Sequence, residues 1–305
     1  MTPDTLAALS VDLPSGTVSG STQATFEIEV PDEGTPQMRV ASDLVGLGLA
    51  IPPAGWAKPD PVRGAFEAIV LLEETPEITA LSLSAPGLSA ENIRLNLTED
   101  RELAAVTIPR LRLEDWLDAG VTVTPRGPGQ IPALRIEGGR LDIRGLASQS
   151  GTGGTANGNG PVVLNPDRVV ISDGITLTNF SGQLRPWSGI SGQFTARING
   201  GTAIQGGVIP VNNGTAIRIQ ANDAGGASRD AGFLRNGAGG TLDLILSPTG
   251  SPGSYDGEML MENVTVRDAP ALAALLDGIS IVGLLDNGGT GIQFNTVDAS
   301  FLLTP

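Results

Sequence analysis

The chain has 305 residues, of which 40% are hydrophobic but only 4% aromatic, so a core has to be built from aliphatic side chains. It contains no Cys and no His, which excludes thiol nucleophiles, Ser-His-Asp triads, imidazole metal sites and disulfides. The formal net charge of −15 comes without any basic cluster, and this argues against nucleic acid as a partner.

The 42 Gly and 22 Pro indicate many short strands joined by turns. No apolar run is long enough to span a bilayer, and no signal peptide follows Met1. We expect one continuous β-rich region over residues 1–305 that is truncated at both ends and belongs to a longer protein.

The first half of the chain alternates between apolar and polar residues, which predicts half-buried strands. Residues 114–120 read as a small helical turn closed by Gly120. A hairpin is expected across Glu137-Gly138-Gly139, with arms at 134–136 and 140–144. The other predicted strands cover residues 22–30, 38–51, 65–72, 78–85, 92–97 and 103–108.

The second half begins with a flexible loop at residues 148–160, where Gly, Ser, Thr and Asn dominate. A short helix is expected at 230–234. Residues 179–184 and 191–196 each pair a Gly with an alternating polar and apolar arm. The predicted strands cover residues 169–171, 175–183, 192–199, 203–205, 215–221, 241–246 and 255–266.

The strongest helical signal lies at residues 268–285. Asp268 is a suitable N-cap, and Pro270 falls in the first turn, where its missing N–H costs nothing. The helix either packs on the sheet or caps an open apolar groove. In both cases four residues at helical spacing face the apolar side: Leu272, Leu275, Leu276 and Ile279.

Strand follows strand with no alternation of strands and helices along the chain. We therefore expect a mainly β fold: an extended, curved, largely antiparallel sheet, shaped like a groove or half-barrel. One C-terminal helix and a few short helical turns complete the expected fold.

Motifs at both ends of the chain resemble the AsmA-like family, specifically the C-terminal region of its YhdP-like branch. The N-terminal segment 42–59 contains Ser42-Asp43-Leu44-Val45-Gly46-Leu47 and Trp56-Ala57-Lys58-Pro59. The C-terminal segments are Asp230-Ala231-Gly232-Phe233-Leu234, Gly240-Thr241-Leu242-Asp243-Leu244, Asp268-Ala269-Pro270-Ala271-Leu272-Ala273 and Gly291-Ile292-Gln293-Phe294. These are mostly apolar and glycine positions, which mark a fold and carry no chemistry.

The resemblance implies a protein of Gram-negative bacteria, anchored in the inner membrane by a segment absent from this chain. It implies a long β-sheet groove on the periplasmic face of the inner membrane. It also implies a role in phospholipid transport toward the outer membrane, and thus in outer membrane biogenesis.

The residues themselves favour a lipid-binding, lipid-conducting groove over an enzyme. Acyl chains need only continuous apolar surface, worth about 0.8 kcal/mol per buried methylene. The partners expected are phospholipid acyl chains, and the lining candidates are Ile217, Ile219, Leu242, Leu244, Leu246, Val264 and Val266. The alternative for these residues is that they fill a closed core, as in a structural or adhesive β-rich surface protein.

Enzymatic function has little support in the sequence. Glu73 and Glu74 are neighbours in sequence, and such neighbours point to opposite faces of a strand, so they are poorly suited to act as a pair; Glu114-Asp115 is the other carboxylate pair considered. Without His, a general base would have to be a carboxylate, Lys58 or Tyr255. We expect no catalytic residue, no metal and no cofactor.

Overall fold

The computed structural model describes residues 16–74, 76–100, 102–127, 130–144, 160–186, 190–212, 214–251, 253–267 and 291–304. The helix predicted at 268–285, with Leu272, Leu275, Leu276 and Ile279, lies outside the described residues, as does the loop predicted at 148–160 apart from Gly160. Strands make up 63% of these described residues and helical segments 5%, which confirms the mainly β, curved and largely antiparallel fold. The chain divides into two compact units, residues 1–163 (unit 1) and 164–305 (unit 2).

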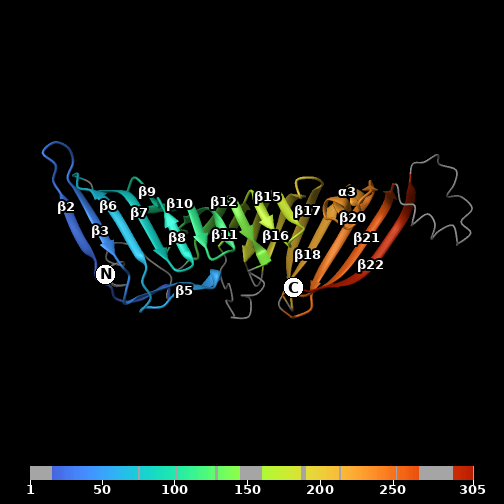
Figure 1. Ribbon diagram of the computed structural model, residues 1–305, viewed down its shortest axis with the longest axis horizontal. Helices are drawn as coiled ribbons and strands as arrows, with labels where there is room; N and C mark the ends of the chain where they lie inside the picture. Colours follow the sequence, from blue (N-terminus) through green and yellow to red (C-terminus); the bar gives the residue numbers. More distant parts are fainter. Residues whose placement is uncertain are drawn as a thin grey trace, which may run out of the picture. The chain divides into compact units, whose positions relative to one another are not determined.

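Unit 1 contains one large antiparallel sheet (Figure 1). Its strands pair in the order β2-β3-β6-β7-β8-β10-β11-β12, and β9 also pairs with β10. Their bounds are β2 Thr25–Glu29, β3 Gln37–Ser42, β6 Ala65–Leu71, β7 Glu77–Ala85, β8 Leu88–Glu91, β9 Arg94–Leu97, β10 Leu103–Leu113, β11 Leu117–Thr124 and β12 Ala133–Asp142.

A second, three-stranded sheet in unit 1 consists of β1 (Val18–Gly20), β4 (Leu47–Ile51) and β5 (Trp56–Lys58), with the 3-10 turn η1 (Pro52–Ala54) between β4 and β5. The chain leaves the large sheet after Ser42 because Leu44 and Gly46 have positive φ angles of 56° and 88°. A Cβ on Gly46 would collide with the carbonyl oxygen of Ser21, so this turn requires glycine. The uninterrupted strand predicted for residues 38–51 is therefore wrong.

Two other local predictions in unit 1 are corrected. Leu117 to Gly120 belong to β11, so only the residues before them form the turn that was predicted to extend to Gly120. β12 is one strand, and Gly138-Gly139 form a bulge in it: Gly120 lies opposite Glu137, and Asp118 lies opposite Arg140. Both glycines have positive φ (65° and 64°), which suits a bulge as well as a turn, so the predicted hairpin is wrong.

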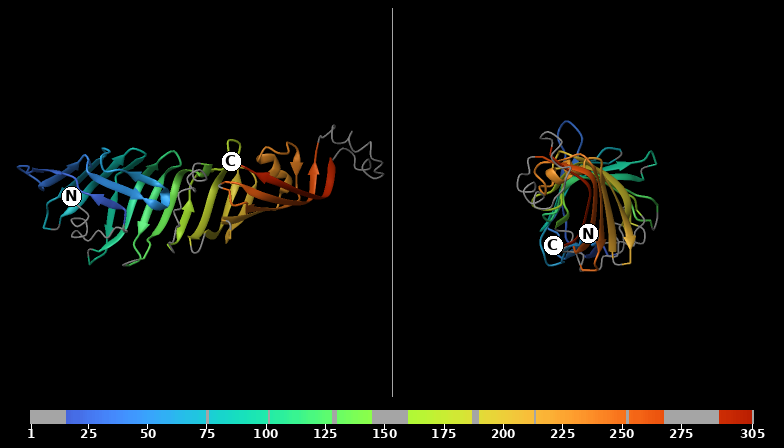
Figure 2. Two further views of the ribbon diagram at one scale, coloured as in Figure 1. Left: turned by 90° about the horizontal axis from the view of Figure 1, so that it is seen from below. Right: turned by 90° about the vertical axis from the view of Figure 1, so that its right-hand side faces the viewer.

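Unit 2 is built on antiparallel strands, which are strongly curved in the right-hand view of Figure 2. The pairing order is β14-β15-β16-β17-β18-β20-β21-β22, and β19 also pairs with β21. The bounds are β13 Val162–Asn165 (containing the division between units), β14 Arg168–Val170, β15 Thr176–Pro186, β16 Ile190–Ile198, β17 Ala203–Val211, β18 Gly214–Ala221, β19 Gly237–Ala238, β20 Thr241–Pro248, β21 Tyr255–Val266 and β22 Ile292–Leu303.

The helix of unit 2 is α3 (Ala224–Asp230), whose N-cap Asp223 accepts a hydrogen bond from the Gly226 amide at 2.8 Å. Sequence reasoning placed a helix at 230–234 instead, so that prediction is wrong. Its Ala-Gly-Gly-Ala-Ser sequence gives little intrinsic helical signal. Small residues are needed because the helix lies close to β19: a Cβ on Gly225 would collide with the backbone of Ala238. In the part of the chain that the structure describes, no helix is long and apolar enough to cross a membrane.

Candidate functional site: an apolar groove in unit 2

Two rows of apolar residues run across the sheet of unit 2, from β15 to β22. Cross-strand partners in an antiparallel sheet point to the same face, so the register defines each row. Row 1 consists of Gly182, Phe194, Gly206, Ile219, Leu244, Met259 and Ala299. Row 2 consists of Leu184, Gly192, Val208, Ile217, Leu246, Gly257 and Phe301. Every position in these two rows is apolar or glycine.

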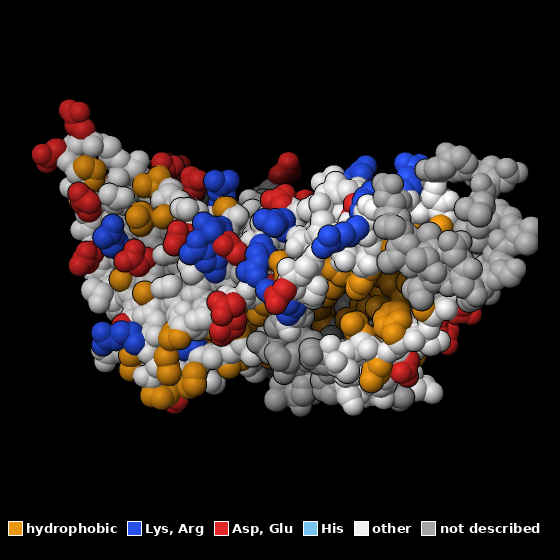
Figure 3. Space-filling view, turned by 45° about the vertical axis from the view of Figure 1, so that its right-hand side comes forward, with side chains coloured by type: hydrophobic (Ala, Val, Ile, Leu, Met, Phe, Trp, Pro, Cys, Tyr) orange, Lys and Arg blue, Asp and Glu red, His pale blue; other side chains and the backbone are white. Residues whose placement is uncertain are grey.

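The side chains of the two rows are incompletely buried. Phe194, Ile219, Leu244 and Met259 of row 1 are half-buried, as are the aliphatic side chains of row 2. Phe301 is 41% exposed. Figure 3 shows a hollow lined by hydrophobic side chains toward the right of the view, where unit 2 lies. We call the apolar surface formed by rows 1 and 2 the groove.

The helix α3 covers the sheet beside one end of the groove. Ala224, fully buried, forms a cluster with Met261 and Val264, which are 8% and 1% exposed. Ser228 of the helix donates from its hydroxyl to the Met261 sulfur at 3.8 Å. This end of the apolar face is therefore a packed core, whereas rows 1 and 2 are not packed to the same degree.

The opposite face of the same strands carries the charged side chains, together with exposed apolar residues such as Ile209 and Ile245. Arg218 and Asp243 lie on neighbouring strands β18 and β20, with Arg218 Nε donating to Asp243 Oδ1 at 2.8 Å. This hydrogen bond and the positive charge of Arg218 lower the pKa of Asp243, and the carboxylate in turn raises the pKa of Arg218. Charge is thus confined to one side of strands that are aliphatic on the other.

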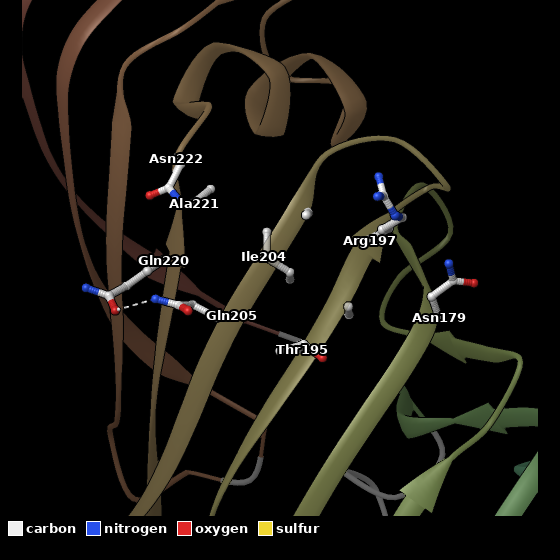
Figure 4. A pocket seen from close by; sticks show the side chains of 10 residues that line it. Asn179, Thr195, Arg197, Ile204, Gln205, Gln220, Ala221 and Asn222 are labelled. Atoms are coloured by element: carbon white, nitrogen blue, oxygen red, sulfur yellow. Dashed lines mark hydrogen bonds between the residues drawn. The ribbon is translucent and has the colours of Figure 1, made fainter.

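A shallow depression of about 330 Å³ lies over β15 to β18, lined mainly by polar side chains (Figure 4). Gln205 and Gln220 meet across β17 and β18, with Gln205 Nε2 donating to Gln220 Oε1 at 3.5 Å. Arg197 Nη1 donates to the Gly201 carbonyl at 2.8 Å. The depression has no carboxylate in its lining, so it offers no acid-base pair.

Metal and catalytic chemistry find little support in the described ranges. There, no group of three or more acidic side chains is close enough together to hold a metal ion. The carboxylates with lowered pKa values include Asp118, Asp142 and Asp243, each of which has an arginine hydrogen bond as the first cause. Such pairs stabilise structure and keep the acids ionised, which suits neither a general acid nor a general base near neutral pH.

The structure places all seven predicted lining residues on the apolar face of unit 2. Ile217, Ile219, Leu244 and Leu246 belong to the two rows, and half-buried Leu242 packs against the cluster under α3. Val264 and Val266 are 1% and 6% exposed, farther along β21 on the α3 side. Sequence reasoning did not select the glycines and phenylalanines of the rows, although the Gly-Phe pattern at 179–184 and 191–196 was a usable signal.

Part of the apolar face of unit 1 is buried, whereas its row at Leu95, Val106, Val123 and Leu134 is half-buried, as in unit 2. Leu88, Leu113, Leu117 and Leu141 form one row across β8, β10, β11 and β12, and they are 6%, 2%, 4% and 7% exposed. The three-stranded sheet is joined to this region by Trp56, whose Nε1 donates to the carbonyl of Pro86 at 2.9 Å. Trp56, Leu44 and Leu47 are themselves buried.

The buried amine of Lys58 holds together the segment from Leu44 to Pro59, which contains β4 and β5. Lys58 Nζ donates to the carbonyl oxygens of Leu44 at 2.8 Å, Leu47 at 2.5 Å and Pro59 at 3.2 Å. Burial lowers the pKa of Lys58, an effect that the charges of Asp60 and Asp43 oppose. The three carbonyls satisfy the three donors of the ammonium group, which is the condition for burying it.

Comparison with protein-family profiles, with curated protein sequences and with solved structures found no match.

Proposed function

We propose that unit 2 binds phospholipid acyl chains in the groove, as a non-enzymatic lipid-binding and lipid-conducting surface. The observation that carries this proposal is the pair of uninterrupted apolar rows, which span the sheet of unit 2 from β15 to β22 and stay half-buried, whereas the leucine row of unit 1 is buried. Apolar surface that is left open on a folded domain commonly marks a binding site.

The chemistry of the rows fits an aliphatic chain. An acyl chain makes no hydrogen bonds, so its site needs no polar group, and each methylene it buries contributes about 0.8 kcal/mol. The rows offer aliphatic side chains, methionine and two flat phenylalanine rings. A ligand with a buried charge or hydroxyl would find no partner there.

The length of the groove also fits. Each row passes through six interstrand pairings, which at about 4.8 Å per strand gives roughly 30 Å. One acyl chain spans about half of a hydrocarbon core that is about 30 Å thick. The groove is therefore long enough for an extended acyl chain lying across the strands.

The resemblance to AsmA-like proteins supports the cellular setting of this proposal. It would place the groove in the periplasm, in a protein held at the inner membrane through a segment absent here, and acting in phospholipid transport to the outer membrane. The buried leucine row of unit 1 favours the alternative, a structural or adhesive β-rich protein, for that part of the chain.

The test is transfer of a fluorescent phospholipid. Phosphatidylcholine carrying a parinaroyl chain gains fluorescence in apolar surroundings, and the full chain is mixed with vesicles that contain it. Native mass spectrometry of the recovered protein then identifies bound phospholipid. Free parinaric acid, run in parallel, distinguishes a phospholipid site from a fatty-acid site.

Adjacent residues of β20 provide a matched pair of variants. Leu244 points into the groove, and Ile245, 37% exposed, points to the opposite face beside Arg218 and Glu258. We expect Leu244→Asp to abolish binding and Ile245→Asp to preserve it. Failure of the unaltered chain to acquire phospholipid or fluorescence would refute the proposed function.

A further inference from the structure

The aromatic side chains of the groove lie over glycines. A Cβ built on Gly206 would fall 2.6 Å from Cε1 of Phe194, its cross-strand partner in row 1. A Cβ on Gly257 would fall 2.8 Å from Cε1 of Phe301, its cross-strand partner in row 2. Real Cβ atoms essentially never come this close, so each ring occupies the space that any other residue would need at the glycine.

A third ring fixes the direction in which Phe194 can move. Phe180 stacks on Phe194, with ring centroids 5.3 Å apart and planes inclined by 15°. Phe180 in turn lies over Gly182, where an added Cβ would be 2.9 Å from its Cε1. Phe194 is therefore held between Phe180 on one side and Gly206 on the other. If the space over Gly206 were filled, the ring would have to rise away from the sheet.

We infer that Gly206 and Gly257 set the depth of the acyl-chain groove by letting Phe194 and Phe301 lie flat against the sheet. This inference rests on the proposed function and adds which residues determine what the groove admits. The flat rings form part of its floor, so a slender, flexible aliphatic chain passes over them. The glycines are positioning residues, because they act on the ligand through the rings.

The decisive variant is Gly206→Ala, with Gly207→Ala as its matched control. Gly207 is the next residue of β17 and points to the opposite face, where an added Cβ would meet only the Gly192 carbonyl oxygen at an ordinary 3.6 Å. We expect Gly206→Ala to weaken binding of the parinaroyl phospholipid about tenfold, since a raised ring displaces roughly two methylenes of contact. Gly207→Ala should bind as the unaltered chain does.

A rescue variant separates the groove from simple destabilisation. A Cβ on Gly206 would also lie 2.9 Å from the Arg218 carbonyl oxygen, so the alanine strains the strand as well as moving the ring. The double variant Gly206→Ala/Phe194→Leu keeps the backbone strain and removes the ring. It should recover most of the binding while its thermal unfolding stays close to that of Gly206→Ala.

Gly257→Ala provides a second measurement, because the three nearest atoms to its added Cβ all belong to the Phe301 ring. Binding in both Gly206→Ala and Gly257→Ala equal to that of the unaltered chain would overturn the inference and leave the proposed function standing. The same holds if the double variant fails to regain binding. Absence of binding by the unaltered chain would instead overturn the proposed function.

Discussion

The two units are made of similar antiparallel sheets, yet they treat their apolar faces differently. In unit 1 the leucine row at Leu88, Leu113, Leu117 and Leu141 is almost inaccessible, and a second sheet carrying buried Trp56 and Lys58 is joined to this region. In unit 2 the corresponding surface is half-buried, and α3 covers only the neighbouring end. One kind of strand pattern thus carries a buried leucine row in unit 1 and two long half-buried rows in unit 2.

Because the strand patterns of the two units are alike, we attribute the burial of the leucine row to the segment that joins it through Trp56. This segment contains the turn at Leu44 and Gly46 and a buried ammonium group with three carbonyl partners. Both features are costly in isolation and persist only where the surrounding structure compensates for them. In unit 2, only the short helix α3 covers part of the apolar face among the residues that the structure describes.

The strongest test of this difference between the units is to make the same substitution, Leu to Asn, on the apolar face of each. Leu113→Asn should destabilise unit 1 by about 4 kcal/mol, because it removes a buried side chain and buries an amide without partners. Leu244→Asn should cost unit 2 only about 1 to 2 kcal/mol, since the amide remains accessible to water. Hydrogen exchange followed by mass spectrometry reports each unit separately.

Phospholipid binding adds a second readout to this pair. Leu244→Asn should lose binding while remaining folded, and Leu113→Asn should speed exchange in unit 1 and leave phospholipid binding unchanged. Equal destabilisation by the two substitutions would mean that the groove is as well packed as the core, and the comparison between the units would fail.

The buried amine of Lys58 is the next test of the segment from Leu44 to Pro59. Lys58→Met fills similar volume but removes the ammonium group that bonds the carbonyls of Leu44, Leu47 and Pro59. We expect a loss of about 3 kcal/mol in the free energy of unfolding of unit 1, since hydrogen bonds to a charged group contribute about 1.5 to 3 kcal/mol. Urea denaturation and exchange of β4 and β5 amides measure it.

Arg63→Met is the control for Lys58→Met. Its side chain is 78% exposed, and its ion pair with Asp43 is long, at 3.5 Å. Removing such a pair changes stability by less than about 0.5 kcal/mol. If Lys58→Met were equally mild, the amine would not be what holds that segment together.

The two units should also differ, by a smaller amount, in how their free energy of unfolding depends on pH. Asp142 of β12 has an 8% exposed side chain and bonds Arg140 and Arg144; its hydrogen bonds to Arg144 are the main cause of its lowered pKa. A lowered carboxyl pKa adds stability above its unfolded value of about 3.9, and this stability is lost as the pH falls through the folded pKa. Asp142→Asn should therefore lower the free energy of unfolding of unit 1 by about 2 kcal/mol at pH 7. It should also make that free energy fall less as the pH is lowered.

Asp243→Asn in unit 2 is the matched control for the pH dependence of Asp142→Asn. Asp243 is 29% exposed and bonds a single arginine, Arg218, so the same change of pH should alter unit 2 less. Thermal unfolding between pH 3 and pH 7 measures both variants. A steeper acid dependence for Asp243 than for Asp142 would contradict the assignment of the more buried ion pair to unit 1.

The sequence predicted the strands well because their periodicity is local. Ile217 and Ile219 alternate with Arg218 and Gln220, and Leu244 and Leu246 are two residues apart, so each pair lies on one face of its strand. The register then places the two pairs in shared rows. The fold class and the common face of these four residues could thus be predicted before any coordinates.

Features that depend on partners far apart in the chain were missed. Gly138-Gly139 suits a turn or a bulge equally, and only pairing with β11 decides between them. The departure of β4 into a second sheet and the burial of Lys58 depend on what packs over unit 1. Likewise, Gly206 and Phe194 become a pair only through the β16-β17 register, which no sequence window contains.

The smallest expected effect concerns α3, the partial cover of unit 2. Asp223 Oδ1 accepts from the Gly226 and Gly239 amides, both at 2.8 Å, so it joins the start of the helix to the turn before β20. Asp223→Ala should cost about 1 kcal/mol, the usual value of an N-cap, and speed amide exchange in α3 alone. Asp256→Ala, at an exposed position on the polar face of β21, is the control. If α3 limits the groove, loosening it exposes Met261 and Val264 and increases binding of the parinaroyl phospholipid; unchanged binding with faster exchange would show that rows 1 and 2 act without that end.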